Sequence, residues 1–270
     1  MLVVACIKQV PDTTQVSIDP VTNTLIREGV PFIMNPYDTH ALEEALRLKD
    51  RYGFRVAAIS MGPPNAEMTL RRALAAGADE VVLLSDRAFG GADTLATSQV
   101  LSEAIKRLNE QDEVAIVLCG KQTIDGDTAQ VGPGIATRLG YTQLTLVDQI
   151  QQLDMKARMV RVRRKLEGRH EIVEAPFPSV LTVVREINRP RYPTVPMRLA
   201  AEKAEIPVWG NAVMTIDPET IGLKGSPTKV NRIFSPERDK GEILGDGAND
   251  PDGAASLLIE RLMSKDLLPL

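Results

Sequence analysis

The chain has 270 residues, a formal net charge of −4 and 4% aromatic residues. Its length allows a core of its own, packed mainly by aliphatic side chains, in one large domain or in a domain with a long extension. The negative charge argues against a nucleic-acid-binding protein, because contact with a phosphate backbone requires a basic surface. No stretch reaches the roughly 20 apolar residues that span a bilayer, and the first residues show no signal-peptide pattern, so we expect a cytoplasmic protein.

Strand-like and helix-like segments alternate in the first half of the chain. Continuous apolar runs rich in β-branched residues predict strands over 2–7, 55–61, 80–84 and 114–119. Amphipathic segments predict helices over 39–51, 65–76, 94–108 and up to about 139, the first capped by Asp38 or Thr39. The polar run over 8–23 is expected to form a loop that could wrap a ligand. The alternation predicts an α/β fold, with a parallel sheet and helices on both of its faces.

A glycine-rich stretch over 120–134, GKQTIDGDTAQVGPG, joins the fourth strand to its helix. Thr128 is placed to cap that helix, and Pro133 suits its first turn, where the missing N–H has no partner to lose. Free N–H groups and the positive end of the helix dipole would attract an anion at 128–131, beyond the carboxyl ends of the strands. An ordinary capped turn fits the same spacing, and the stretch contains neither a P-loop nor a Rossmann fingerprint.

A second glycine-rich turn, over 85–94, leads into the helix at 94–108 with Asp93 or Thr94 as its cap. Two such turns at one sheet edge would suit a ligand with more than one phosphate, although two independent capped turns have the same pattern. Tyr37 precedes the helix at 39–51, where its ring could pack on a planar ligand or bridge core and surface.

The pattern changes to period two after residue 141, and it predicts strands over 144–150, 159–165, 170–174 and 179–184. We interpret the arginines between 158 and 165 as outer positions of a hairpin, because no aromatic residues are interleaved with them. Cys6 and Cys119 lie in apolar runs and are expected to be buried free thiols. His40 and His170 have no Cys or second His at ligand spacing, so no metal site is expected.

Prolines punctuate the chain from Arg189 onwards, between helix-like stretches at 197–205 and 251–265. This segment has too little apolar periodicity to fold compactly by itself. It predicts an arm that lies along another surface, with an obligate partner subunit as the economical explanation.

Five stretches of the sequence, in this order, resemble the β subunit of electron transfer flavoproteins: VVACIKQVPDT, GVPFIMNPYD, ISMGPP, GKQTIDGDTAQVGPG and VRRKLEGRHEIVEAPFPSVLTVVREINRPRY. The resemblance covers most of the chain. It implies an adenine-nucleotide hydrolase-like α/β nucleotide-binding domain over 1–188, with a β-hairpin region at about 142–184. It also implies that 189–270 forms a C-terminal arm and terminal helix that embrace the electron transfer flavoprotein α subunit in an obligate heterodimer.

Three stretches are similar to the branch of this family that binds a second FAD and bifurcates electrons, including its nitrogen-fixation-associated members: 86–98, 125–133 and 224–237. This similarity implies that NADH passes a hydride to the FAD of this subunit. One electron would go through the α-subunit FAD to a high-potential acceptor, and the other to ferredoxin or flavodoxin. The chemistry is that of the cofactor, so no side chain is expected to be catalytic and activity would require the heterodimer.

The resemblance also implies site residues. The adenosine would contact Ala5, Asn35, Pro36, Tyr37, Asp38 and Met61. The phosphate would lie in the loop formed by Gly120, Lys121, Gln122, Thr123, Ile124, Asp125, Gly126, Asp127, Thr128, Ala129, Gln130 and Val131. The longer FAD diphosphate would also need Asp93, Thr94 and Thr97.

A docking loop for acyl-CoA dehydrogenases is implied at Arg191, Tyr192, Pro193, Thr194, Val195, Pro196 and Met197. Val195 stands where those family members often carry Leu, and a membrane quinone oxidoreductase is the other acceptor of this kind. Two further functions stay open. The chain could be a carrier subunit with structural AMP in place of the second FAD, or an adenine-nucleotide-binding regulatory module, against which the long arm counts.

Overall fold

The computed structural model describes residues 1–12, 31–231 and 241–268. The chain divides into two compact units, Met1–Asn231 and Arg232–Leu270. Most of the expected polar loop over 8–23, and the end of the stretch over 224–237, lie outside the described residues.

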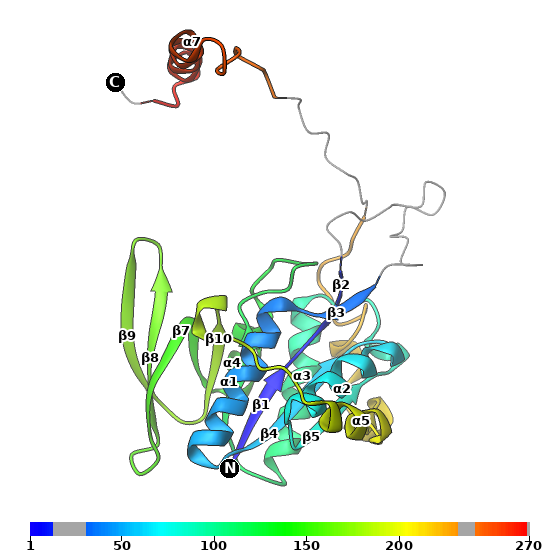
Figure 1. The fold of residues 1–270 in the computed structure, drawn as a ribbon. Coiled ribbons are helices and arrows are strands. Elements are labelled where there is room, and N and C mark those ends of the chain that lie inside the picture. The colour runs from blue at the N-terminus through cyan, green and yellow to red at the C-terminus, as the bar shows by residue number, and fades with distance from the viewer. Residues whose placement is uncertain (13–30, 232–240, 269–270) are drawn as a thin grey trace. The chain divides into compact units, whose positions relative to one another are not determined.

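A nine-stranded sheet runs through the described part of the first unit (Figure 1), in the order β11-β5-β4-β1-β6-β10-β7-β8-β9. These strands are β1 (Leu2–Cys6), β4 (Arg55–Met61), β5 (Glu80–Leu84), β6 (Val114–Gly120), β7 (Thr142–Asp154), β8 (Met159–Leu166), β9 (Arg169–Pro176), β10 (Ser179–Val183) and β11 (Val208–Trp209). Strands from β11 to β7 in this order pair in parallel, whereas β8 and β9 are antiparallel additions. The expected α/β class is confirmed, with a sheet that is mostly rather than wholly parallel.

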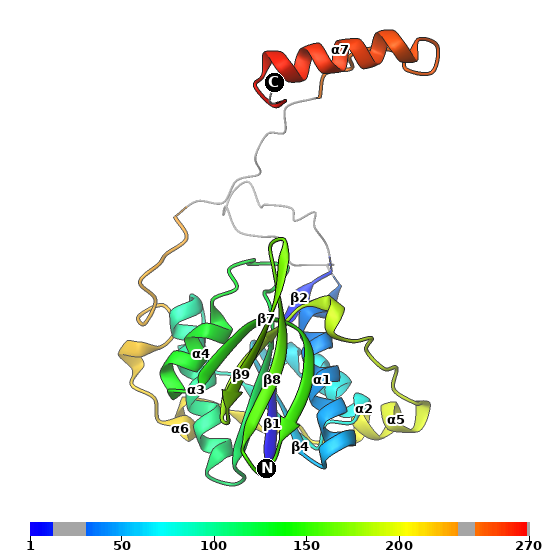
Figure 2. The same ribbon diagram turned by 90° about the vertical axis from the view of Figure 1, so that its left-hand side faces the viewer.

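Helices cover both faces of this sheet, as Figure 2 shows. On one side lie α1 (Pro36–Tyr52) and α2 (Glu67–Ala76), and on the other lie α3 (Thr94–Asn109) and α4 (Val131–Leu139). Alternation along β1 supplies both cores, because successive side chains of a strand point to opposite faces. Val3 and Ala5 pack with α1 and α2, whereas Leu2, Val4 and Cys6 pack with α3 and α4.

Several boundaries differ from those expected. Helix α1 begins at Pro36 rather than Thr39, because proline is well suited to a first helical position. Asn35 is therefore the N-cap residue in place of Asp38 or Thr39. Strand β7 spans Thr142–Asp154 rather than 144–150. Strand β10 lies between β6 and β7, although β9 precedes it in the chain.

Residues 189–231 form the last part of the first unit. They include α5 (Val195–Lys203), which begins two residues earlier than expected because the Thr194 hydroxyl accepts a bond from Met197 N at 3.4 Å. They also include α6 (Asn211–Met214) and Ile216 and Ile221, which are buried in the core beside α3. A short antiparallel ribbon, β2 (Gln9–Pro11) with β3 (Phe32–Met34), completes the described strands.

The second unit contains α7 (Pro251–Ser264), on which Leu257, Leu258, Ile259 and Met263 are all exposed. Within the stretches that the structure describes, no helix combines the length and the apolar character needed to cross a membrane.

Leu118 tests the central core. It lies on β6 and is fully buried. We expect Leu118→Ala to lower the free energy of unfolding by about 2–5 kcal/mol, through lost burial and the cavity left behind. The measurement is urea unfolding, with Leu199→Ala on α5, where the side chain is 59% exposed, as the matched control. Equal losses in both variants would contradict this account of the core.

Candidate functional site

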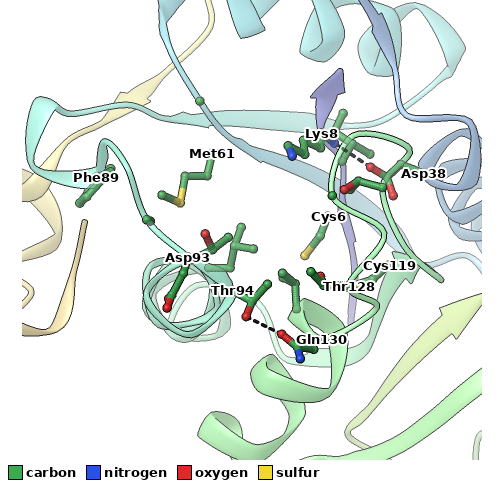
Figure 3. A pocket seen from close by; sticks show the side chains of 18 of the residues that line it. Cys6, Lys8, Asp38, Met61, Phe89, Asp93, Thr94, Cys119, Thr128 and Gln130 are labelled. Atoms are coloured by element: carbon green, nitrogen blue, oxygen red, sulfur yellow. Dashed lines mark hydrogen bonds between the residues drawn. The ribbon is translucent and has the colours of Figure 1, made fainter. Parts of the chain in front are cut away.

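A cavity of about 840 Å³ opens at the carboxyl ends of β1, β4, β5 and β6 (Figure 3). Most of its lining comes from the ends of these strands and the segments that follow them, within 6–8, 61–64, 85–94 and 119–132, and α1 and α3 add Asp38, Thr97 and Leu101. The turns meet here because parallel strands end at the same edge of a sheet, which is where ligands bind in open α/β folds. The volume lies in the upper part of the usual range for small-molecule sites, roughly 300–1,000 Å³.

The start of α1 joins the ends of the two central strands. The fully buried Asn35 side chain donates to Gln122 O at 2.9 Å and accepts from Ile124 N at 3.2 Å. The carboxylate of Asp38 accepts from Lys8 N at 2.8 Å and from Gly120 N at 3.1 Å. Both side chains therefore fix backbone that leaves β1 and β6.

Gly120 shows how closely these parts approach. A Cβ atom at this position would lie 2.6 Å from the Cβ of Tyr37 and would also overlap the Asp38 carboxylate. A larger residue would force the end of β6 away from α1, so glycine is required by space rather than by conformation.

Burial raises the pKa of Asp38 from its ordinary 3.8 to about 7. Hydrogen bonds from Asn35 and from the N–H groups of Lys8 and Gly120 act in the opposite direction, because they stabilise the charged form. The net shift shows that desolvation is the larger effect at this carboxyl.

The loop over 120–131 adopts an unusual backbone. Asp127 and Ala129 have φ of 51° and 56°, in the left-handed region that residues other than glycine seldom occupy. Gln122 donates to Asp127 at 2.7 Å, and Lys8 pairs with Asp125 at 2.6 Å across the cavity rim. Non-glycine residues in this region cost free energy and are concentrated at functional sites.

Helix α4 begins at Val131, so the expected cap at Thr128 is wrong. Gln130 is the N-cap residue and makes no side-chain cap hydrogen bond. Within the described residues, none of the N–H groups of 128–132 donates to another group of the chain. These donors and the positive end of the α4 dipole therefore remain available for an anion at the cavity.

Helix α3 begins differently. The Asp93 carboxylate accepts from Leu95 N at 2.9 Å and from Ala96 N at 3.1 Å, and therefore caps α3 with the chain's own negative charge. Thr94 donates to Gln130 Oε1 at 2.8 Å and joins the two helix starts across the cavity. The glycine-rich turn at 85–94 thus forms a wall rather than a second open anion site.

The structure brings many of the expected cofactor residues to one cavity. Its lining includes Asp38, Met61, Asp93, Thr94, Thr97, Gly120, Lys121, Gln122, Thr123, Gly126, Thr128, Ala129, Gln130 and Val131. Ala5, Asn35, Pro36, Tyr37, Ile124, Asp125 and Asp127 do not line it. Ala5 faces α1 in the opposite core, and the Tyr37 ring lies 5.1 Å from the Arg185 guanidinium. Cofactor contact by any of these residues stays a prediction.

Sequence reasoning missed other lining residues, among them Lys8, Arg87 and Phe89. Each follows a predicted strand of the sheet, and that position was the available signal. Cys6 and Cys119 also line the cavity, as free thiols in register on β1 and β6. A hydrogen bond with Cys119, together with burial, raises the pKa of the Cys6 thiol. Among the described residues, no cluster of three or more His, Cys, Asp or Glu side chains could hold a metal ion.

The expected docking loop lies away from the cavity, along α1 and α5. Arg191 anchors it by pairing with Glu43 at 2.9 Å and with Asp50 at 2.7 Å, and these acids raise the pKa of the guanidinium. Beyond this anchor, Tyr192 is 95% exposed and Val195 69% exposed. The exposed side chains of Tyr192 and Val195 therefore lie next to a backbone position that the ion pairs of Arg191 hold in place.

Comparison with known proteins shows a match to the electron transfer flavoprotein domain over residues 22–214. The chain is 48% identical to electron transfer flavoprotein subunit beta of Clostridium acetobutylicum, over 97% of this chain and 98% of the relative. It is 46% identical to Protein FixA of Azotobacter vinelandii, over 97% and 94%. It is also 46% identical to caffeyl-CoA reductase-Etf complex subunit CarD of Acetobacterium woodii, over 99% and 100%.

The raised pKa of Asp38 generates a pH prediction. The folded chain holds this proton more tightly than the unfolded chain, so the contribution is fully present below about pH 4 and is lost as the pH rises through about 7. We expect Asp38→Asn to remove this component, so that the free energy of unfolding falls less between these pH values than in the wild type. Urea unfolding across the range measures it. Asp252→Asn, at an exposed position, is the control, and superimposable profiles for wild type and Asp38→Asn would contradict the prediction.

Proposed function

Because the chain belongs to the electron transfer flavoprotein family, among its β subunits, we propose that it binds FAD and bifurcates electrons from NADH in a heterodimer with an α subunit. The observation that carries the proposal is the cavity at the carboxyl ends of β1, β4, β5 and β6. On one side it has backbone donors that are without a partner among the described residues, and on the other it has the glycine-rich wall at 85–94.

The size of the cavity supports a dinucleotide. At about 840 Å³ it extends from the loop at 120–132 to the wall at 85–94, so a ligand longer than a mononucleotide can contact both. Met61, Phe89 and Leu101 contribute apolar surface, and polar side chains come both from the wall at 85–94 and from the loop at 120–132. A mostly apolar site with a few placed polar groups is typical of a cofactor pocket.

The chain's own residues divide the binding task. The N–H groups at 128–132 would hold a phosphate, aided by the α4 dipole. Lys8, Arg87 and Lys121 are the cationic residues of the lining and would balance further negative charge. Thr94 and Thr97 offer hydroxyls in the first turn of α3, whereas the Asp93 carboxylate would repel a phosphate and serves instead to position the wall.

Bound FAD would supply hydride acceptance and single-electron transfer, and the protein supplies position, field and shelter from water. The buried side chains of Asn35 and Asp38 hold the loop at 120–131 in place through hydrogen bonds to its backbone, without a bound ligand. We assign no acid, base or nucleophile role to a side chain.

Partners follow from the same family membership. The exposed apolar side chains of α7 fit an arm that embraces the α subunit. The apolar surface at Tyr192 and Val195 fits a docking loop for an acyl-CoA dehydrogenase or a membrane quinone oxidoreductase. Ferredoxin or flavodoxin would be the low-potential acceptor, and a cytoplasmic location agrees with these partners.

One observation favours a second candidate, a carrier subunit that holds structural AMP. Asp93 already caps α3, so among the described residues the cavity offers a phosphate one uncapped helix start, that of α4. A mononucleotide with a single phosphate needs no more than that.

Cofactor content separates these candidates. We expect the purified heterodimer to release two FAD and no AMP, and its flavin absorbance to bleach when NADH is added without oxygen. One FAD with one AMP, and no bleaching, would instead make the chain a simple carrier subunit. A nucleotide-binding chain that purifies without any α subunit would point to the regulatory module.

The hydroxyls near α3 give a second test. We expect the double variant Thr94→Val, Thr97→Val to weaken FAD binding about tenfold, since a hydrogen bond to a charged group is worth about 1.5–3 kcal/mol. Thr137→Val is the control, because its hydroxyl bonds Pro133 O on the exposed side of α4. Flavin fluorescence titration measures the affinity. Unchanged FAD binding in the double variant would mean that these two hydroxyls do not contact the FAD diphosphate.

A further inference from the structure

A second segment of the chain contacts the cavity wall at 85–94 on the side away from the cavity. A segment over 210–228, here called the strap, runs along the outside of this wall and contributes Ile216 and Ile221 to the core beside α3. The strap does not line the cavity. Its contacts are with the backbone and side chains of the wall.

Asp86 joins the strap to one end of the wall. One carboxylate oxygen accepts from Ala88 N at 2.9 Å, within the wall, and the other accepts from Asn211 N at 2.8 Å, in the strap. The bonds from Ala88 and Asn211 lower the pKa of Asp86. The carboxylate is therefore shared between the two segments.

Asp93 repeats this arrangement at the other end. One oxygen caps α3, and the other accepts from Thr228 N at 3.2 Å and from the Thr228 hydroxyl at 2.9 Å. The N–H of Asp93 donates to the Ser226 hydroxyl at 2.8 Å, which in turn donates to Gly222 O at 2.6 Å. Ser226 is buried, so this chain of bonds is sheltered from water.

Two glycines permit the close contact between these ends. Gly222 has φ of 56°, and a Cβ there would overlap Ala88 O of the wall. Gly91 has φ of 72°, and a Cβ there would lie 2.6 Å from Leu223 of the strap. Wall and strap therefore fit as one packed layer, and neither can shift far without the other.

We propose that Asp86 and Asp93 are positioning residues that couple occupancy of the cavity to docking of the strap. A wall released from the strap would hold its cavity-lining groups less firmly, so the ligand would bind more weakly. By linkage, a ligand that orders the wall must favour the docked strap to the same extent. The choice of FAD as the ligand rests on the proposed function, whereas the coupling does not.

Variants of the strap test the coupling without touching the cavity lining. The double variant Ser226→Ala, Thr228→Val in the full chain removes the side-chain bonds to Asp93. We expect it to raise the dissociation constant for FAD about tenfold, and Thr228→Ser in an otherwise wild-type chain to keep wild-type affinity. Ser264→Ala, which removes a hydroxyl bonded to Arg261 O on α7, is the matched control.

Limited trypsin cleavage supplies the readout that a merely structural role would not change. Lys224 is exposed in the strap, and the rate of cleavage after it is followed by mass spectrometry. We expect saturating FAD to slow this cleavage several-fold in the wild type and much less in the double variant. Cleavage after Lys156, which is exposed in the turn between β7 and β8 and does not line the cavity, should not respond to FAD.

The outcomes separate this inference from the proposed function. If FAD binds, but the double variant of the strap keeps wild-type affinity and FAD does not slow cleavage after Lys224, the coupling is overturned and the proposed function stands. If only AMP binds and it protects Lys224, FAD binding is overturned and the coupling stands. If neither nucleotide binds to the wild-type chain, both are overturned.

Discussion

The site depends on one buried carboxylate. Beyond the carboxyl ends of parallel strands, the backbone N–H groups no longer bond to a neighbouring strand and need other acceptors. Asp38 accepts from Lys8 N and Gly120 N, and so ties the ends of β1 and β6 to the start of α1. The loop at 120–131 leaves the sheet at the Gly120 that this tie holds, contains the left-handed residues Asp127 and Ala129, and leads to the start of α4, which has no side-chain cap.

Backbone rather than side chains dominates the chemistry of this edge. Three acidic side chains, Asp38, Asp86 and Asp93, line a cavity proposed for an anionic ligand. The pKa of Asp38 is raised by burial whereas those of Asp86 and Asp93 are lowered, yet all three carboxyl groups accept hydrogen bonds from backbone N–H groups. Bonds of this kind stabilise the charge locally and hold loops in place. The donors at 128–132 have no such partner in the described chain, so the site distinguishes its two helix starts by capping one of them.

The sequence pattern predicted the helices and strands that depend on residues close together in the chain. Apolar runs predicted β1, β4, β5 and β6, and the amphipathic pattern predicted that α2 ends at Ala76. It did not predict that β10 enters between β6 and β7, because strand order depends on contacts between residues far apart in the chain. The same reason hid the roles of Asn35 and Asp38. Their partners lie more than 80 residues away at Gly120 and Gln122, and no local spacing records such bonds.

The two edges of the sheet limit how the chain can associate with others. An edge strand offers unpaired backbone groups and invites another chain to extend the sheet, which leads to aggregation. Strand β11 is only two residues long, and the Arg107 guanidinium lies 5.4 Å from its Trp209 ring. Strand β9 carries Glu171 and Glu174 in ion pairs with arginines of β8. The short length of β11 and the charges on β9 disfavour edge-to-edge pairing with the sheet of another chain. We therefore expect this protein to recognise its partners through side-chain surfaces rather than by strand addition.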